Sequence, residues 1–298
     1  KVSVVENNAV RVVFLVETDL ELPEAASPDR VGRSDRTVAC PLKTYLTLAV
    51  GARRVDIRTV FDNRACDHRL RVLFPSGIPA RVSHAESTFD VVERPIAVPP
   101  CPDWREPMPA MHPQKTFVDV SGAGVGLTVI NKSLPEYEVK DDEARTIAVT
   151  LMRATGSGVR GPKMQREGQL QGEHVFEYAL YPHAGDWEEA KSWREAHAFN
   201  APLICGQTEV REGDLPLRTS LVDVKAESFV VTAVKKAEAG ESLIVRGFNI
   251  GCKPEAPAMD VAGAVSTERV CLDERMGDPA DEGAAPPKRI ITQRVTLA

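Results

Sequence analysis

The sequence is poor in aromatic residues and has no long apolar run. Phe, Trp and Tyr together make up 5% of its 298 residues. No apolar run approaches the roughly 20 residues that a membrane-spanning helix needs. An excess of basic residues is also absent, because the net charge is −6. We therefore expect no membrane span and no binding of nucleic acids or anionic membranes.

Clustered metal ligands are missing as well. The six cysteines lie far apart and form no C-x-x-C pair: Cys40, Cys66, Cys101, Cys205, Cys252 and Cys271. The six histidines show no ligand spacing either. We expect no metal site in this chain. Free thiols in a reducing cytoplasm are the expectation, although the sequence leaves disulfides open.

Short β-branched segments separated by turn residues are plentiful, and the sequence contains 22 prolines. This pattern predicts a mainly β protein. The central stretch, residues 117–183, predicts a meander of four strands followed by a fifth, over the ranges 117–120, 126–131, 137–140, 146–153 and 174–180.

Further strands are predicted on both sides of this stretch. Residues 2–5 and 10–17 predict a hairpin, residues 42–49, 54–62 and 67–74 one antiparallel sheet, and residues 89–95 another strand. Towards the C-terminus, strands are predicted over the ranges 217–224, 229–235, 242–249, 261–265, 268–272 and 290–297. The acidic, Gly- and Pro-rich residues 273–287 predict a mobile loop.

One helix is predicted, from Trp187 to Ala198. Asp186 is a suitable N-cap, acidic residues occupy the first turn and basic residues follow, as the helix dipole favours. Asn200 and Pro202 should end this helix.

Several motifs in this order resemble the C-terminal β-domain of glycoside hydrolase family 38. They are FVDVS, LPEYEV, TLMRATG and EYALYPHAGDW, all within residues 117–187. The resemblance implies a large antiparallel β-sandwich of the galactose-mutarotase-like supersandwich type over residues 1–183. A linking helix over residues 184–201 and a smaller C-terminal β-sandwich over residues 202–298 should follow.

The resemblance also implies a function. Family 38 enzymes cleave α-mannosidic bonds with retention, using an aspartate nucleophile and a zinc ion that lie on an N-terminal domain. This chain has no matching motif and begins with Lys1 rather than Met. We therefore expect an inactive fragment of a longer cytoplasmic enzyme, which meets its α-mannoside substrate and zinc through the missing part. The DHRLRVLFP and FDVVERP segments are closer to bacterial mannosylglycerate hydrolases, and the parent protein is expected to be bacterial and to form homo-oligomers.

Five residues are candidates for lining the substrate site. Arg153, Arg160 and Arg166 belong to a basic loop, and a guanidinium group binds hydroxyls or anions in two places at once. The alternative for this loop is a solvated turn. Trp104 and His112 lie in a proline-rich segment that either reaches a carbohydrate cleft, where Trp104 stacks on a sugar, or forms a stiff loop over a sheet edge.

A carboxylate pair is also visible, since Glu136 and Glu138 alternate with Tyr137 on a predicted strand. They should share one face and point towards water. The alternative to a hydrolase fragment is a stand-alone carbohydrate-binding β-sandwich module. A third alternative is a segment that serves assembly.

Overall fold

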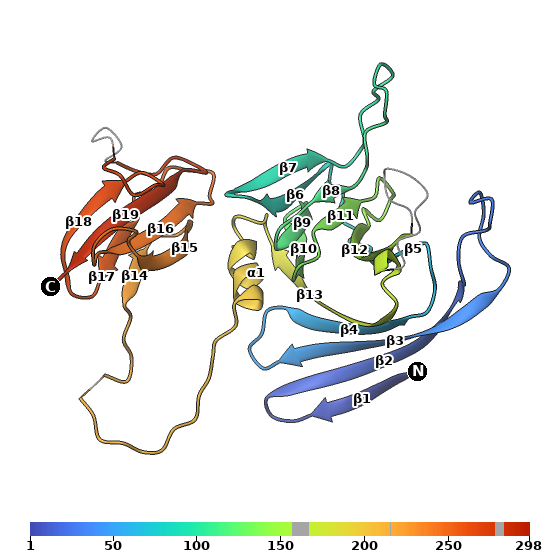
Figure 1. The fold of residues 1–298 in the computed structure, drawn as a ribbon, viewed down its shortest axis with the longest axis horizontal. Helices are drawn as coiled ribbons and strands as arrows, with labels where there is room; N and C mark the ends of the chain where they lie inside the picture. The colour runs from blue at the N-terminus through green and yellow to red at the C-terminus, as the bar shows by residue number, and fades with distance from the viewer. Residues whose placement is uncertain (157–166, 215, 278–282) are drawn as a thin grey trace. The chain divides into compact units, whose positions relative to one another are not determined.

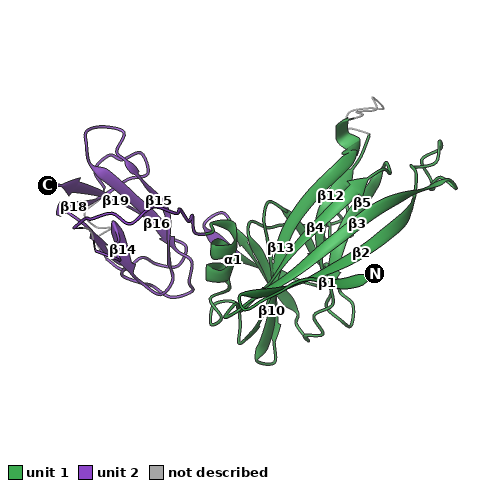
Figure 2. Ribbon diagram, turned by 90° about the horizontal axis from the view of Figure 1, so that it is seen from below, with its two compact units in different colours: residues 1–87, 92–202 green, residues 88–91, 203–298 purple. Residues whose placement is uncertain are grey.

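The chain forms two compact units. The computed structural model describes residues 1–156, 167–214, 216–277 and 283–298. Residues 1–87 and 92–202 make up the first unit, and residues 88–91 and 203–298 the second (Figure 2).

A nine-stranded sheet dominates the first unit, in the order β1-β2-β3-β4-β13-β10-β9-β6-β7 (Figure 1). Its strands are β1 (Val2–Asn7), β2 (Arg11–Pro23), β3 (Thr37–Ala49), β4 (Val55–Asn63), β6 (Val82–Ser87), β7 (Asp90–Pro95), β9 (Phe117–Gly122), β10 (Val125–Asn131) and β13 (Gly172–Ala184). A second sheet has four strands in the order β5-β12-β11-β8. Its strands are β5 (His68–Phe74), β8 (His112–Pro113), β11 (Glu136–Val139) and β12 (Ile147–Ala154).

The two sheets of the first unit share one apolar core. Val118 and Val129 of the large sheet pack in the same buried cluster as Tyr137 and Val149 of the small sheet. Strand alternation accounts for this arrangement, because successive side chains of a strand point to opposite faces. The first unit is therefore a β-sandwich.

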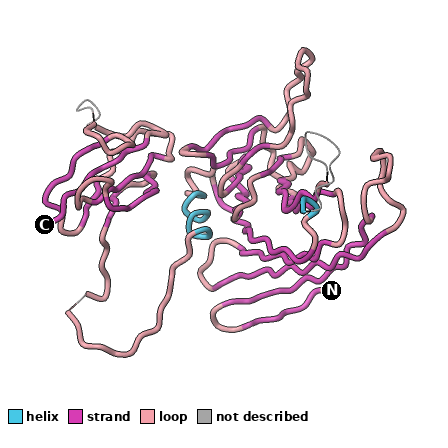
Figure 3. The backbone as a smooth tube through the Cα atoms, in the orientation of Figure 1, coloured by secondary structure: helices cyan, strands magenta, loops and turns pink. Residues whose placement is uncertain are grey.

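The other face of the large sheet carries α1 (Ser192–Asn200), the one α-helix of the described residues, drawn in cyan in Figure 3. This helix contacts β9 and β10. Phe117, Asp119 and Thr128 alternate with the core residues and so point towards this helix. We call this side of the large sheet the helix face. A short 3₁₀ turn, η1 (Glu167–Gln169), precedes β13.

The second unit also consists of antiparallel strands. Its four-stranded sheet has the order β15-β16-β19-β18, and β14 pairs with β17. The strands are β14 (Val222–Lys225), β15 (Phe229–Lys236), β16 (Leu243–Asn249), β17 (Ala258–Val261), β18 (Ala264–Val270) and β19 (Ile290–Leu297). Val245, Val261 and Val295 join the two sheets in one buried cluster. The predicted fold class, mainly β with one helix, is thus confirmed.

The predicted meander over residues 117–183 is wrong. Strands β9, β10 and β13 belong to the large sheet, whereas β11 and β12 form a hairpin in the small sheet. Strand β5 likewise pairs with β12 instead of joining β3 and β4. Alternation identifies which side chains are buried, but both sheets bury apolar residues against the same core, so it does not assign a strand to a sheet.

The predicted helix start is also wrong. Oδ1 of Asp186 accepts hydrogen bonds from the backbone N–H groups of Glu188 and Glu189, both at 2.9 Å. It therefore caps a turn, and the helix starts only at Ser192 because Lys191 adopts a left-handed conformation with φ 54°. The helix ends at Asn200, two residues beyond the predicted Ala198, and thus includes the residue that was expected to stop it.

Three predicted C-terminal strands have wrong bounds. The strand predicted over residues 268–272 is β18, which runs from Ala264 to Val270. The strand predicted from residue 217 begins at Val222. Leu217 is fully exposed, so its side chain does not pack against the core of the second unit. The strand predicted over residues 261–265 is interrupted by a turn at Ala262 and Gly263. Gly263 has φ +76°, which a glycine adopts without strain. Part of the predicted loop 273–287 lies outside the described residues.

Replacing Ile147 with Ala should lower the free energy of unfolding of the first unit by about 2–5 kcal/mol, because it leaves a cavity in a closely packed core. Ile147 is fully buried in the cluster between the two sheets. All three tryptophans lie in the first unit, so their fluorescence during urea unfolding reports on that unit.

The matched control is Val31→Ala, at a position that is 89% exposed. It should change the free energy of unfolding by less than about 0.5 kcal/mol. Equal effects of the two substitutions would contradict the core described above.

Candidate functional site

Charged side chains gather on the outer face of the small sheet. Direct cross-strand partners share a face, so the register of β5, β11 and β12 places six side chains together. We call this set the charged face; its members are Arg69, Arg71, Glu136, Glu138, Thr150 and Arg153.

Glu136 is the centre of the charged face. It accepts hydrogen bonds from the Thr150 hydroxyl at 2.5 Å and from Nε of Arg153 at 2.9 Å. Nη1 of Arg69 lies 3.8 Å away. Burial raises the pKa of Glu136, but these hydrogen bonds and the two guanidinium charges outweigh burial and hold that pKa below its usual value. Glu138 forms a separate ion pair with Arg71.

This arrangement can bind polar groups, but it is unsuited to acid catalysis. A general acid of a glycosidase needs a raised pKa, whereas the pKa of Glu136 is lowered. Each guanidinium group has five N–H donors, so the arginines retain donors for hydroxyl groups beyond those that bind Glu136 and Glu138.

The five sequence candidates do not form one site. Arg153 belongs to the charged face, whereas His112 pairs with Tyr137 and therefore lies on the opposite face of the same sheet. Burial, followed by the charge of Arg94, lowers the pKa of His112. Trp104 is 61% exposed in the loop between β7 and β8. Arg160 and Arg166 lie outside the described residues.

The structure also contains a buried polar cluster that the sequence analysis missed. Nε2 of His183 donates to the Asp119 carboxylate at 2.8 Å, and the Thr128 hydroxyl donates to the same carboxylate oxygen at 2.6 Å. Oγ of Ser192 lies 2.7 Å from Oγ1 of Thr128. The one signal in the sequence was a charged residue inside the apolar strand FVDVS.

The geometry of this cluster differs from that of a nucleophilic triad. In a triad, the carboxylate and the nucleophile contact different nitrogens of the imidazole ring. Here Nε2 of His183 contacts both Asp119 and Thr128. Thr128 and Ser192 are fully buried, so a substrate has no access to their hydroxyl groups. The cluster therefore binds α1 to the large sheet.

A second buried carboxylate fixes the same helix. Glu86 is fully buried and contacts Nε2 of His197 at 2.9 Å and Nζ of Lys115 at 3.5 Å. The Thr116 hydroxyl also donates to it. Helix α1 is thus fixed to the helix face at its first turn by Ser192 and at its last turn by His197.

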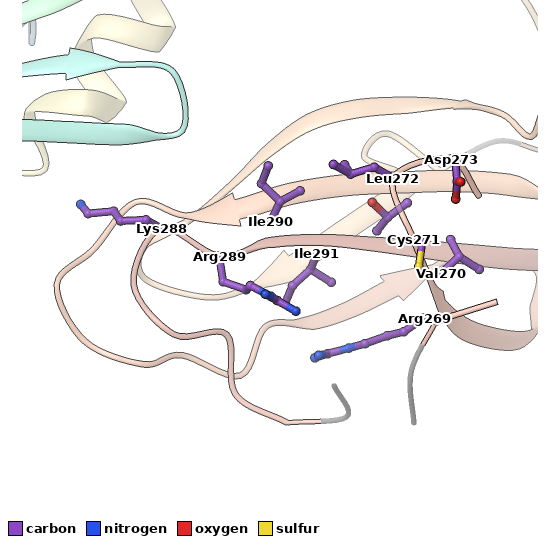
Figure 4. A pocket seen from close by; sticks show the side chains of 11 residues that line it. Arg269, Val270, Cys271, Leu272, Asp273, Lys288, Arg289, Ile290 and Ile291 are labelled. Carbon is purple, nitrogen blue, oxygen red and sulfur yellow. The ribbon is translucent and has the colours of Figure 1, made fainter. Parts of the chain in front are cut away.

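The second unit contains an open pocket of about 640 Å³. Ile290 and Ile291 line it together with Arg269 and Arg289, whose side chains extend on the same side of the strands in Figure 4. Because the lining includes Gly277, where the described part of the chain stops, we assign this pocket no function.

Metal ligands do not converge in the described ranges. Among those residues, no group of three or more His, Cys, Asp or Glu side chains is placed to hold a metal ion. The described part of the chain also has no helix that is both long and apolar enough to cross a bilayer.

The fold defines this chain as a two-unit, antiparallel β protein with a charged sheet face and no catalytic constellation among its described residues. Residues 3–157 match the glycosyl hydrolases family 38 C-terminal domain, and residues 228–295 match the glycosyl hydrolases family 38 C-terminal beta sandwich domain. The chain belongs to glycosyl hydrolase family 38, which confirms the resemblance found in its motifs.

Named relatives agree with this membership. A putative mannosylglycerate hydrolase of Halalkalibacterium halodurans is 31% identical over 98% of this chain and 34% of its own length. Alpha-mannosidase 2C1 of Homo sapiens is 26% identical over 71% of this chain and 20% of its own length. An alpha-mannosidase from Enterococcus faecalis V583 superposes with a TM-score of 0.89 at 29% identity, over 99% of this chain and 35% of its own. The chain spans at most about a third of the length of these relatives.

Replacing Glu136 with Gln should lower the free energy of unfolding at pH 7 by about 0.5–1 kcal/mol, because it removes a partly exposed ion pair. The lowered pKa of Glu136 means that its stabilisation is complete above the ordinary value of 4.5 and is lost as the pH falls through the folded-state pKa. The difference between the variant and the parent should therefore vanish in acid. Urea unfolding at several pH values measures it.

The exposed residue Glu173 gives the control, since Glu173→Gln should have no effect at either pH. A difference for Glu136→Gln that is the same at neutral and at acid pH would contradict the ion pair described for the charged face.

Proposed function

We propose that this chain is the non-catalytic C-terminal β-domain of a longer, retaining, zinc-dependent α-mannosidase-type hydrolase of family 38. In this proposal it supports the catalytic part and contributes a lining to the mannose site. The observation that carries the proposal is the coverage: nearly the whole chain matches only about a third of each bacterial relative.

The chemistry of the described residues supports a non-catalytic role. Retaining glycosidases need two carboxyl groups about 5 Å apart, one of them with a raised pKa. The carboxylates of the charged face are neutralised by arginines instead. The residues that the structure describes do not fit a zinc ion. We therefore derive no step through one, and we assign zinc and the α-mannoside to the rest of the protein.

For the lining, Arg153 is the proposed contact. It lies half exposed near the end of β12, directly before the loop that contains Arg160 and Arg166. Its guanidinium plane is held by Glu136, so it is oriented before a ligand arrives. The exposed ring of Trp104 is suited to stacking on a sugar. All six cysteines lie among the described residues and are unbridged thiols, which favours a reducing cytoplasm.

The purified 298-residue chain should not hydrolyse aryl α-mannosides, with or without added zinc, and should retain no zinc after dialysis. The physical reason is that its carboxylates and histidines do not converge on a reactive or metal-binding geometry among the described residues. Turnover assays and elemental analysis measure both quantities. Bound zinc at one ion per chain together with turnover would contradict the proposal.

Calorimetric titration of the chain with mannose and with mannosylglycerate distinguishes the two remaining functions. A lining that lacks the rest of its site should bind these sugars weakly, with dissociation constants above about 1 mM, equivalent to less than about 4 kcal/mol. Arg153→Ala should weaken that binding further, whereas Lys43→Ala, on strand β3, should not. Micromolar binding would favour a stand-alone carbohydrate-binding module over a supporting domain.

A further inference from the structure

His183 is placed unusually for a residue near the end of a strand. Its side chain is 2% exposed, and the Asp119 side chain is fully buried. The imidazole ring lies over Gly126 of the neighbouring strand, where an added Cβ atom would come within 2.2 Å of the ring carbon Cε1. Only a residue without a side chain at this position leaves the ring enough space to reach Asp119.

Both ring nitrogens of His183 face oxygen atoms. Nε2 lies 2.8 Å from Oδ2 of Asp119, and Nδ1 lies 3.3 Å from the backbone carbonyl oxygen of Ala184. A neutral imidazole carries one N–H group, whereas the protonated ring carries two. The geometry therefore fits the imidazolium form, in which each nitrogen donates to an acceptor.

The pair is connected directly to α1. Thr128 donates its hydroxyl hydrogen to Asp119, and its oxygen is 2.7 Å from the hydroxyl oxygen of Ser192, the first residue of the helix. Ser121 donates to the other carboxylate oxygen of Asp119. A change in the charge balance at Asp119 therefore reaches the start of the helix through one hydroxyl group.

Several charged groups surround the ring. Asp119 comes from β9 and Asp186 from the turn after β13, and both favour the protonated form. Glu189 from the same turn and Arg53 from the turn between β3 and β4 line an open pocket of about 490 Å³ together with His183. His183 is thus one of the residues that line an open pocket, although its side chain is only 2% exposed. Tyr181 packs its ring 5.2 Å from that of His183, and Arg53 in turn lies over Tyr181.

We propose that the His183–Asp119 pair is a proton-dependent latch for helix α1, closed when His183 is protonated and loosened when it is neutral. Loss of the proton leaves the Asp119 charge buried without its positive partner and removes one of the two ring donors. A buried carboxylate without its cation is strongly destabilising. The strain acts on the hydroxyl group of Thr128, which holds Ser192.

The direction of the pH effect follows from the titration of His183. Burial lowers its pKa, but the hydrogen bond from His183 to Asp119 and the charge of Asp119 outweigh burial, so the pKa lies above the ordinary value of 6.5. A raised folded-state pKa means that the stabilisation is complete below the ordinary value and is lost as the pH rises through the folded-state pKa. The latch should thus open on the alkaline side of pH 6.5.

The second histidine of the helix provides a matched control. His197 contacts the buried carboxylate of Glu86, as His183 contacts Asp119. However, Nζ of Lys115 also lies 3.5 Å from Glu86, so this carboxylate has a second partner besides the imidazole. The attachment at His197 therefore does not rest on the imidazole alone.

Two measurements on the full chain test the proposal. In an NMR titration, the His183 ring should titrate with a midpoint above 6.5. In hydrogen exchange, corrected for intrinsic rates, the opening constant of residues 192–200 should rise by up to about tenfold per pH unit between pH 6.5 and that midpoint, as expected for one proton. His183→Gln should abolish this pH dependence, whereas His197→Gln should keep it.

A midpoint at or below 6.5 would overturn the latch, as would an unchanged pH dependence of helix opening in His183→Gln. If that variant does not fold, both measurements on the parent chain test the proposal. Helix opening that does not change between pH 6.5 and the His183 midpoint would overturn it.

Discussion

The double pairing of strand β13 is the constraint on which the rest of the first unit depends. Along its length β13 pairs with β4 on one side and with β10 on the other. It therefore joins the β1–β4 half of the large sheet to the half formed by β10, β9, β6 and β7. Successive side chains of β13 point to opposite faces of the large sheet. Tyr178 points into the sandwich core, where its hydroxyl group is hydrogen-bonded to that of Thr59. Tyr181 and His183 point to the helix face. A register slip of one residue would exchange these two sets of side chains.

The helix face shows how a sheet can hold a short helix with polar contacts. A nine-residue helix has little apolar area to bury, and only Ser192, Trp193 and Ala196 of α1 are buried. Two buried carboxylates, each hydrogen-bonded to a histidine, hold the helix on the sheet where apolar packing alone is too small to do so. Such groups are tolerated in the interior only when their hydrogen bonds are satisfied. The carboxylates of the charged face on the small sheet differ from these two. They are partly exposed and are paired with arginines instead of histidines.

Local patterns in the sequence predicted most strands of this protein, including 290–297 over its full observed length. They did not predict the division of strands between sheets, because both sheets use the same apolar alternation against one core. The helix start was missed because the left-handed conformation of Lys191 has no marker in its residue type. For the candidate site, the shared face of Glu136 and Glu138 followed from their spacing, but their pairing with Arg71 and Arg153 depends on strand register. Ser121 is a local partner of Asp119, two residues away. Thr128 and His183, however, lie 9 and 64 residues from Asp119, so no local pattern indicates that they meet.

In the proposed function, this β-rich chain works as the supporting part of a longer family 38 hydrolase. Its fold, its family membership and the arginine-paired carboxylates of its charged face agree with that role. The sequence of the gene that encodes this chain tests the claim most directly. The account predicts an open reading frame that continues upstream of Lys1 into a domain with the carboxylates and metal-binding histidines that a zinc-dependent glycosidase requires. An open reading frame that starts at this β-domain, with no such coding region before it, would contradict the account.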